Sequence, residues 1–151
     1  MPYFMMLISL FAADSAIKCW IEKTDNVSEF QVRTVFRGVA IKRYHNRGAM
    51  MNLGENRQQL VAMLSVVFSA FVTGSFAATL CRRGKRMLKT GLALILGGAY
   101  SNTYDRLRRK YVVDYITFPK LGSIVFNLSD FGIIIGAILL SISELLSGGQ
   151  D

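Results

Sequence analysis

Residues 58–81, QQLVAMLSVVFSAFVTGSFAATLC, carry no formal charge, although Arg57 and Arg82 flank them directly. As an α-helix rising 1.5 Å per residue, these 24 residues would extend roughly 36 Å, which exceeds the hydrocarbon thickness of a bilayer. Small residues (Ser, Ala and Gly) recur along the segment and permit close approach of a second helix. The segment therefore predicts a transmembrane helix over about residues 60–80.

Three further apolar stretches occur at about residues 3–21, 90–104 and 130–146. Four crossings within 151 residues leave little room for a separate soluble domain. We therefore predict an all-α membrane protein with four transmembrane helices, in which residues 1–151 form a single integral-membrane domain. A cleavable signal peptide explains the first stretch less well, because no basic residues precede its apolar run, and Asp14 and Lys18 interrupt it.

The 18 Lys and Arg residues outnumber the 10 Asp and Glu residues and give a formal net charge of +8. We do not expect this charge to bind nucleic acid, since a basic soluble domain has no use for the long uncharged segment. The chain has one histidine, His45, and two cysteines, Cys19 and Cys81, which fall near opposite ends of antiparallel helices. No metal site, other cofactor or disulfide is therefore expected, and both cysteines are predicted to be small buried hydrophobic residues.

The orientation in the membrane follows from the basic loop RRGKRMLK (82–89), which has five cations and no acid. Such loops face the cytoplasm, so the loop at 81–89 and both termini are predicted to be cytoplasmic. Residues 22–59 and 105–129 are then extracytoplasmic. A second basic cluster at 106–110 on the predicted outer side weakens this assignment.

Residues 29–45 differ from the helical stretches. They are rich in β-branched and aromatic residues with partial apolar and polar alternation, and Arg37-Gly38 is a suitable bend. We expect short strands here, forming a small extracytoplasmic β-platform on the membrane surface. An irregular loop is the alternative.

Several polar residues interrupt or adjoin the apolar stretches, where an unpaired polar group is costly. Asp14 and Lys18 are four residues apart, so they share a helical face and can pair. The spacing fits a structural ion pair and the polar wall of a site equally well. Asn46 and Asn52 offer amide groups around Gly48, but this pattern alone is more typical of a turn.

Four polar residues fall near the outer ends of the third and fourth spans: Asp105, Asp114, Asn127 and Asp130. Asp114 lies among apolar residues, and this favours its protonated form, whereas Asp130 taken alone fits a helix N-cap. Two carboxylates that converge share a proton, so that one takes a proton from water while the other donates to a carbonyl. This is the chemistry of an aspartic protease, and the spacing leaves open whether Asp105 or Asp114 partners Asp130.

Two other classes of protein use polar groups inside a membrane. A small proton-coupled transporter would use the same acids as a proton relay, and a non-enzymatic scaffold would use them only to hold helices together. Transporters usually contain internal repeats with broken helices, and the sequence shows no convincing repeat. A scaffold would keep Asp114 and Asp130 apart, each with its own cap or cation.

The polar residues fall into motifs that resemble those of the bacterial signal peptidase II family, in order along almost the whole chain. DSAIK (14–18) matches its Asp-Gln-x-x-Lys, and HNRGAMM (45–51) is similar to its Asn-x-Gly-Ala-Ala-Phe stretch. GGAYSNTYDR (97–106) resembles Gly-Gly-Ala-x-Gly-Asn-x-x-Asp-Arg. YVVDY (111–115) resembles Val-Val-Asp-Phe, and FNLSD (126–130) resembles Phe-Asn-x-Ala-Asp.

The resemblance implies a membrane aspartic endopeptidase in which Asp114 and Asp130 are the catalytic pair. It also implies a set of residues that contact the substrate or support this pair: Asp14, Asn46, Asn102, Arg106 and Asn127. Lys18 and Asp105 match motif positions with a more structural role.

The same resemblance implies a substrate and a setting. The substrate is a prolipoprotein whose lipobox Cys already carries diacylglycerol, and its signal peptide is cut off just before that Cys. The enzyme is expected to be a multi-pass protein of the bacterial cytoplasmic (inner) membrane, with its active site near the extracytoplasmic face. Its expected partners are lipid-modified prolipoproteins and membrane lipid, with no nucleic acid, and it is expected to be a monomer.

A few residues depart from the family motifs. They are Ser15 for Gln, Met50 and Met51 for Ala-Phe, Ser101 for Gly, Lys110 for Gly and Ser129 for Ala. Lys110 stands four residues before Asp114, where a nearby cation would lower the pKa of the carboxyl. Every catalytic-motif acid and amide is present, so we expect the departures to affect efficiency and substrate preference more than the activity itself.

Overall fold

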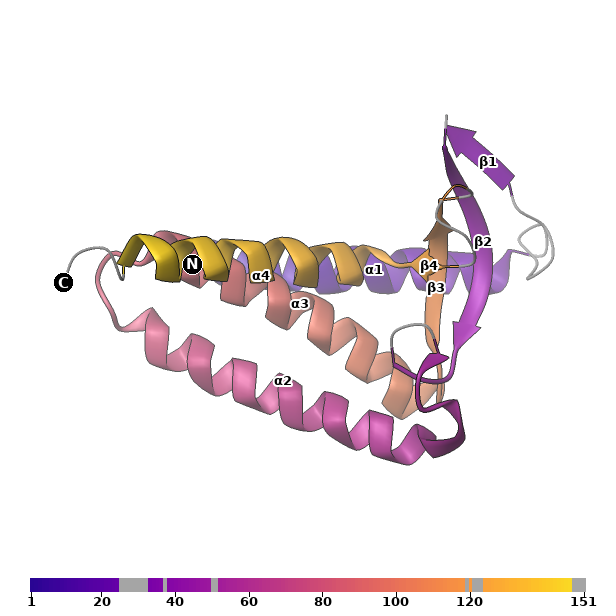
Figure 1. The fold of residues 1–151 in the computed structure, drawn as a ribbon, viewed down its shortest axis with the longest axis horizontal. Coiled ribbons are helices and arrows are strands. Elements are labelled where there is room, and N and C mark those ends of the chain that lie inside the picture. The colour runs from indigo at the N-terminus through magenta and orange to yellow at the C-terminus, as the bar shows by residue number, and fades with distance from the viewer. Residues whose placement is uncertain (25–32, 37, 50–51, 119, 121–123, 148–151) are drawn as a thin grey trace.

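The computed structural model describes residues 1–24, 33–36, 38–49, 52–118, 120 and 124–147. Its long helices run along the long axis of the molecule, and an antiparallel sheet stands across one end of them (Figure 1). The helices are α1 (Pro2–Lys23), α2 (Gln58–Leu80), α3 (Arg86–Arg108) and α4 (Leu128–Ser147), and a short 3-10 helix, η2 (Glu55–Arg57), precedes α2. The predicted helical membrane fold with a small β-platform is confirmed.

Three described helical segments are long and apolar enough to cross a membrane: Pro2–Lys23, Glu55–Leu80 and Leu128–Leu146. They expose large hydrophobic side chains, such as Phe71 on α2 and Leu145 on α4, which are 72% and 78% exposed. Apolar surface of this kind is unfavourable in water and compatible with lipid. The chain is therefore a membrane protein.

Helix α3, which corresponds to the predicted span at 90–104, extends beyond it at both ends, from Arg86 to Arg108. It contacts all three other helices, and most of its residues between Lys89 and Asp105 are buried. Because α3 contains many polar residues, it is not one of the described helices that are apolar enough to cross a membrane by themselves. They are tolerated because the surrounding helices, rather than lipid, cover them.

Two adjacent glycines allow α3 to approach two helices closely. A Cβ atom at Gly97 would lie 2.8 Å from the carbonyl oxygen of Leu7 on α1, and one at Gly98 would lie 2.5 Å from that of Ser129 on α4. Neither position has room for a side chain. Asn102, one turn beyond Gly98 on the same face of α3, is thereby brought close to the first turn of α4.

The sheet has the strand order β1 (Arg33–Phe36), β2 (Val39–Asn46), β3 (Val112–Thr117) and β4 (Val125–Phe126), with antiparallel neighbours. Its β-branched and aromatic residues favour extended structure. Strands predicted within 29–45 are confirmed by β1 and β2, while residues 29–32 and Arg37 lie outside the described residues.

The pairing of β2 with β3 joins the segment before α2 to the segment after α3. Tyr44 lies opposite Asp114, and Asn46 lies opposite Val112. The sheet therefore places Asn46 and Asp114 close together at the end of the helical bundle.

The N-terminal end of α1, the C-terminal end of α4 and the connection between α2 and α3 lie at the end of the bundle away from the sheet (Figure 1). The predicted cytoplasmic loop at 81–89 is shorter than expected, because α3 already begins at Arg86. The basic residues of the α2–α3 connection thus lie at the opposite end of the molecule from the sheet, whereas the second basic cluster, 106–110, lies at the sheet end.

Both cysteines are free, and both are exposed. The prediction that Cys19 and Cys81 are buried is wrong. In a membrane protein, apolar side chains are stable on the lipid-facing surface, so hydrophobic character does not imply burial.

Candidate active site

Asp114 lies on β3 and is 2% exposed. Its carboxylate oxygens accept hydrogen bonds from two amide groups, Asn127 Nδ2 at 2.7 Å and Asn46 Nδ2 at 3.1 Å. Burial and, next, the negative charge of Asp130 raise the pKa of Asp114 to about 7, although the two amide donors act in the opposite direction. This agrees with the predicted preference of Asp114 for its protonated form.

Asp130 is the third residue of α4 and is bound reciprocally to the residue just before the helix. Asn127 Oδ1 accepts the backbone N–H of Asp130 at 3.0 Å, and Asp130 Oδ2 accepts the backbone N–H of Asn127 at 3.0 Å. This is a capping box, in which Asn127 takes the N-cap position. The expectation that Asp130 itself is the N-cap is therefore wrong. Its other oxygen, Oδ1, accepts a hydrogen bond from Asn102 Nδ2 at 3.1 Å.

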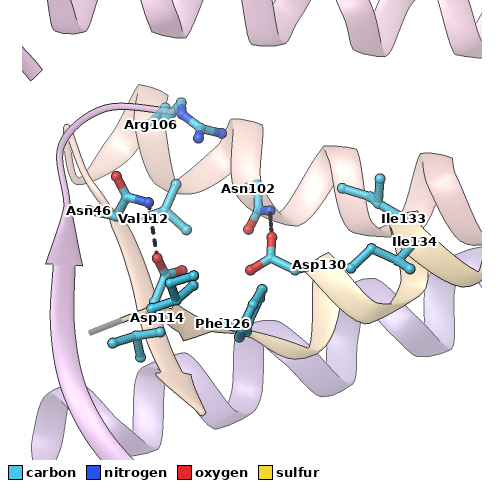
Figure 2. A pocket seen from close by; sticks show the side chains of 11 residues that line it. Asn46, Asn102, Arg106, Val112, Asp114, Phe126, Asp130, Ile133 and Ile134 are labelled. Atoms are coloured by element: carbon cyan, nitrogen blue, oxygen red, sulfur yellow. Dashed lines mark hydrogen bonds between the residues drawn. The ribbon is translucent and has the colours of Figure 1, made fainter. Parts of the chain in front are cut away.

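Asp114 and Asp130 line one cavity of about 200 Å³, which they enter from β3 and from the start of α4 (Figure 2). Asn127 contacts both carboxylates, because its side chain donates to Asp114 and its backbone N–H donates to Asp130. The remaining lining residues are Asn46, Asn102, Arg106, Val112, Ile124, Val125, Phe126, Ile133 and Ile134. A buried acid, Asp114, and a partly buried one, Asp130, thus face with their amide partners a space that is otherwise mostly apolar.

Asp105, the other candidate partner of Asp130, is not among the described residues that line this cavity. Its Oδ2 accepts the backbone N–H of Val113 at 3.2 Å and lies 3.1 Å from Lys18 Nζ. Its Oδ1 lies 3.2 Å from an Arg109 guanidinium nitrogen. The geometry thus favours Asp114 over Asp105 as the partner of Asp130.

Asp14 and Lys18 form an ion pair at 2.7 Å, with side chains that are 0% and 1% exposed. Neither belongs to the described lining of the cavity. Lys18 Nζ also donates to Asn102 Oδ1 at 2.8 Å, which leaves the NH₂ group of Asn102 to bind Asp130. Of the two interpretations of this pair, the structural one fits, and the pair supports the site through Asn102 rather than lining it.

Arg106 on α3 lines the cavity and reaches across to the segment before α2. Its Nη2 donates to the carbonyl oxygen of Gly48 at 3.2 Å, and its Nε is buried with no hydrogen-bond partner in the described part of the chain. The backbone N–H of Gly48 donates in turn to Asn46 Oδ1 and Asn52 Oδ1, at 3.1 and 3.2 Å. The predicted turn thus forms, and it also orients Asn46 toward Asp114.

Lys110 does not have the effect expected from its place in the sequence. Its side chain is exposed, and its Nζ donates to the carbonyl oxygen of Leu107 at 3.0 Å. The backbone turns at Lys110, with φ of +71°, between α3 and β3. The pKa of Asp114 is raised rather than lowered, and the cation that acts against this rise is Lys18 rather than Lys110.

Three residues around Asp14 were not singled out as functional from the sequence: Ser101, Tyr115 and Ser129. Their hydroxyl groups all bind the Asp14 carboxylate. Two of them, Ser101 and Ser129, were visible only as departures from the family motifs. Nothing in the sequence indicates that these three hydroxyls meet.

Two carboxylates around a mostly apolar cavity can share one proton and activate a water molecule between them. Across the described ranges, no three His, Cys, Asp or Glu side chains are grouped as metal ligands would be. The chemistry that these side chains themselves offer is general acid–base catalysis by a pair of acids.

A family model described as signal peptidase (SPase) II matches residues 6–146. The lipoprotein signal peptidase of Clostridioides difficile (strain 630) is 30% identical over 149 residues, which cover 96% of this chain and 95% of the relative. The lipoprotein signal peptidase of Halothermothrix orenii (strain H 168 / OCM 544 / DSM 9562) is 34% identical over 142 residues, which cover 93% of this chain and 92% of the relative. The solved structure of a bacterial membrane enzyme superposes on this chain with a TM-score of 0.83, and the match covers 99% of this chain and 92% of that enzyme's chain. The two sequences are 18% identical, so the match shows a shared fold.

The fold and the cavity define a class of protein, a helical membrane protein with a surface sheet and a buried acid site at the end of its helices. Within that class, the chain belongs to the signal peptidase II family and is thus a peptidase.

Proposed function

We propose that this chain is a membrane aspartic endopeptidase that removes the signal peptide of diacylglyceryl-modified prolipoproteins by cutting just before the lipobox Cys. Asp114 and Asp130 are the catalytic residues. The observation that carries the proposal is the shared cavity, in which one residue, Asn127, binds both carboxylates. Family membership supports the peptidase activity and the substrate class.

In this mechanism one proton is shared by the two acids. The pKa of Asp114 near 7 favours Asp114 as the protonated partner. Asp130 lies in the first turn of α4, where the helix dipole favours a negative charge, so it acts as the base. Asp130 takes a proton from the bound water as the water attacks the scissile carbonyl carbon. Asp114 donates its proton to the carbonyl oxygen, and the proton held by Asp130 then passes to the leaving amine.

The polar neighbours hold these two acids in place and bind the peptide. Asn46 and Asn102 each donate an amide hydrogen to one carboxylate, so each of them fixes one of the two acid side chains. Arg106 has a buried Nε without a partner among the described residues, and this N–H is available to bind a carbonyl of the substrate backbone.

A second hollow of about 190 Å³ adjoins the cavity and shares Asn102, Arg106, Asp130 and Ile133 with it. Phe68 on α2 and Ala99 on α3 add apolar surface to this hollow. We place an acyl chain of the substrate here, where a lipid tail reaches the site from the bilayer. Anchoring the substrate by its lipid supplies proximity that a soluble protease must obtain from peptide contacts.

The setting of the reaction is part of the same proposal. The active site lies near the extracytoplasmic face of the bacterial cytoplasmic membrane, because the basic α2–α3 connection is at the end of the molecule away from the sheet. Residues 1–151 act as one integral-membrane domain and as a monomer, with lipid and prolipoproteins as partners.

The proposal is tested with Asp114→Asn and Asp130→Asn as separate variants, by following prolipoprotein processing in membranes as a gel shift. We expect each to lose about a thousandfold or more of the cleavage rate, since each removes one half of the acid–base pair. Glu144→Gln, at an exposed position further along α4, is the matched control and is expected to cleave normally. Full cleavage by either aspartate variant would contradict the assignment.

The pH dependence of the wild-type rate gives a second test. Because one carboxyl must be protonated, activity is expected to fall as the pH rises through about 7, the pKa of Asp114. A rate that is constant from pH 6 to pH 9, measured with a diacylglyceryl-Cys peptide in detergent, is incompatible with Asp114 as the proton donor.

A further inference from the structure

The carboxylate of Asp14 lies at the junction of three helices and the sheet, and is completely buried. Its Oδ2 accepts hydrogen bonds from Ser101 Oγ and Ser129 Oγ, both at 2.6 Å, and pairs with Lys18 Nζ at 2.7 Å. Its Oδ1 accepts hydrogen bonds from Tyr115 OH at 2.9 Å and from the backbone N–H of Leu128 at 3.1 Å. Five donors saturate the acceptor capacity of one carboxylate.

The three hydroxyl donors come from three different elements. Ser101 is on α3, Tyr115 is on β3 and Ser129 is on α4, while Asp14 itself is on α1. All three are at most 3% exposed, and none belongs to the described lining of the catalytic cavity. The Asp14 carboxylate is thus a single point at which these elements are fixed to one another.

Each hydroxyl residue is the immediate chain neighbour of a residue that lines the cavity. Ser101 precedes Asn102, Tyr115 follows Asp114, and Ser129 precedes Asp130. Adjacent residues point to opposite faces of a strand and about 100° apart on a helix, so holding one side chain sets the direction of the next. A rotation of α4 that broke the bond from Ser129 to Asp14 would also turn Asp130.

The hydroxyls are a feature of this sequence rather than of the family motifs quoted above. Those motifs have Gly, Phe and Ala where this chain has Ser101, Tyr115 and Ser129. At three separate positions this chain therefore carries a hydroxyl that the quoted motifs lack, and all three hydroxyls bind the same carboxylate.

We propose that Ser101, Tyr115 and Ser129 are positioning residues, which set the relative placement of the three cavity residues beside them by binding one common acceptor. This inference rests on the proposed function, because it concerns the alignment of that acid pair. It adds to the proposed active site three residues that act by positioning their neighbours and do not touch the substrate.

The test uses the full-length protein in detergent with the variants Ser101→Ala, Tyr115→Phe and Ser129→Ala, singly and combined. Each removes one oxygen and adds no volume. We expect kcat for a diacylglyceryl-Cys peptide to fall about threefold to tenfold in each single variant, and further in the triple variant, with KM unchanged. In Tyr115→Phe the alkaline limb of the pH profile moves to lower pH, because Asp114 is less closely held beside Asp130.

Matched controls separate positioning from general stability. Tyr100→Phe removes a hydroxyl on α3 that bonds Thr73 Oγ1 at 2.7 Å, and Ser69→Ala removes one that bonds Thr103 Oγ1 at 3.0 Å. Both are expected to lower the melting temperature without changing kcat measured well below it. If the triple variant does not fold, the Tyr115→Phe variant alone tests the proposal. In this variant the Asp14 carboxylate still accepts the backbone N–H of Leu128.

The outcomes distinguish this inference from the proposed function. If Asp114→Asn cleaves at the wild-type rate in the same assay, the proposed function fails and the inference fails with it. If Asp114→Asn is inactive, but the three hydroxyl variants keep wild-type kcat and pH profile and lose only thermal stability, as the controls do, the inference alone is overturned.

Discussion

Asp14 and Asp114 are equally buried carboxylates, at 0% and 2% exposure, and they differ in what surrounds them. Asp14 has the ammonium of Lys18 at 2.7 Å, three hydroxyl donors and a backbone N–H. Asp114 has two amide donors and a second acid, Asp130, across the same cavity. The first carboxylate has a cation that neutralises its charge, and the second has a neighbour that repels it.

The same buried side chain thus has two uses in one molecule, and its neighbours decide which. A buried acid next to a cation keeps a fixed charge and can hold elements together. A buried acid next to another acid, with only neutral donors, can gain or lose a proton near neutral pH. The residues around Asp14 therefore fit a structural role, and those around Asp114 fit a chemical one.

The largest effect on stability is expected from Lys18→Met. The substitution removes the ammonium shared by Asp14 and Asp105 and leaves both carboxylates without it in a buried site. Breaking a buried ion pair from one side costs about 3–5 kcal/mol. The melting temperature in detergent should fall sharply, or the protein should fail to accumulate in the membrane.

A double substitution controls for the loss of Lys18. Lys18→Met combined with Asp14→Asn removes both charges of the closest pair, and it is expected to be less destabilised than the sum of the two single variants. Purely additive losses would mean that Asp14 and Lys18 do not interact as the structure indicates.

A smaller effect, opposite in sign, is expected from Asp114→Asn. Because its pKa is raised from the ordinary value of 3.8 to about 7, Asp114 contributes stability below pH 4 that is lost as the pH rises through 7. Asn does not titrate, so the variant should gain stability relative to the wild type over this interval. The gain is at most about 4 kcal/mol, at about 1.4 kcal/mol per pKa unit. The measurement is the difference in melting temperature between the two proteins at pH 4, 6 and 8, and a difference that does not grow with pH would contradict the expectation.

The smallest effect is expected from Lys110→Met. The Lys110 ammonium is exposed and bound to the carbonyl oxygen of Leu107, so its removal should leave kcat/KM within about twofold and the alkaline limb unmoved. The check is a pH–rate profile, with Lys110→Arg as the charge-preserving control. If the limb moves to higher pH in Lys110→Met alone, this cation does act on Asp114.

The sequence predicted most of the fold, since α2 is uninterrupted and its uncharged length is unambiguous. It underestimated α3, because hydropathy detects helices that face lipid and α3 is covered by the other helices. The same reasoning misplaced Cys19 and Cys81, which are apolar and lie on the surface. Apolar character indicates burial in water but not in a membrane.

The sequence predicted which residues belong to the candidate site, but it did not predict which of them contact one another. The motifs singled out Asp114 and Asp130, while residue types alone left Asp105 equally open. That choice depends on the register of β3 against β2 and on the Lys18 contact with Asp105, which are tertiary features. The hydroxyls around Asp14 were missed for the same reason, because they meet only once α1, α3, α4 and β3 are packed together.

The central claim, that Asp114 and Asp130 share one proton, is tested most directly by the titration of the carboxyl groups themselves. Carbon-13-labelled aspartate in the detergent-solubilised protein, assigned by the Asp114→Asn and Asp130→Asn variants, reports each group by NMR. We expect Asp114 to titrate near pH 7, and at lower pH once Asp130 is replaced by Asn. If Asp114 titrates near 4, and the Asp130→Asn substitution does not move it, the two acids do not form a pair.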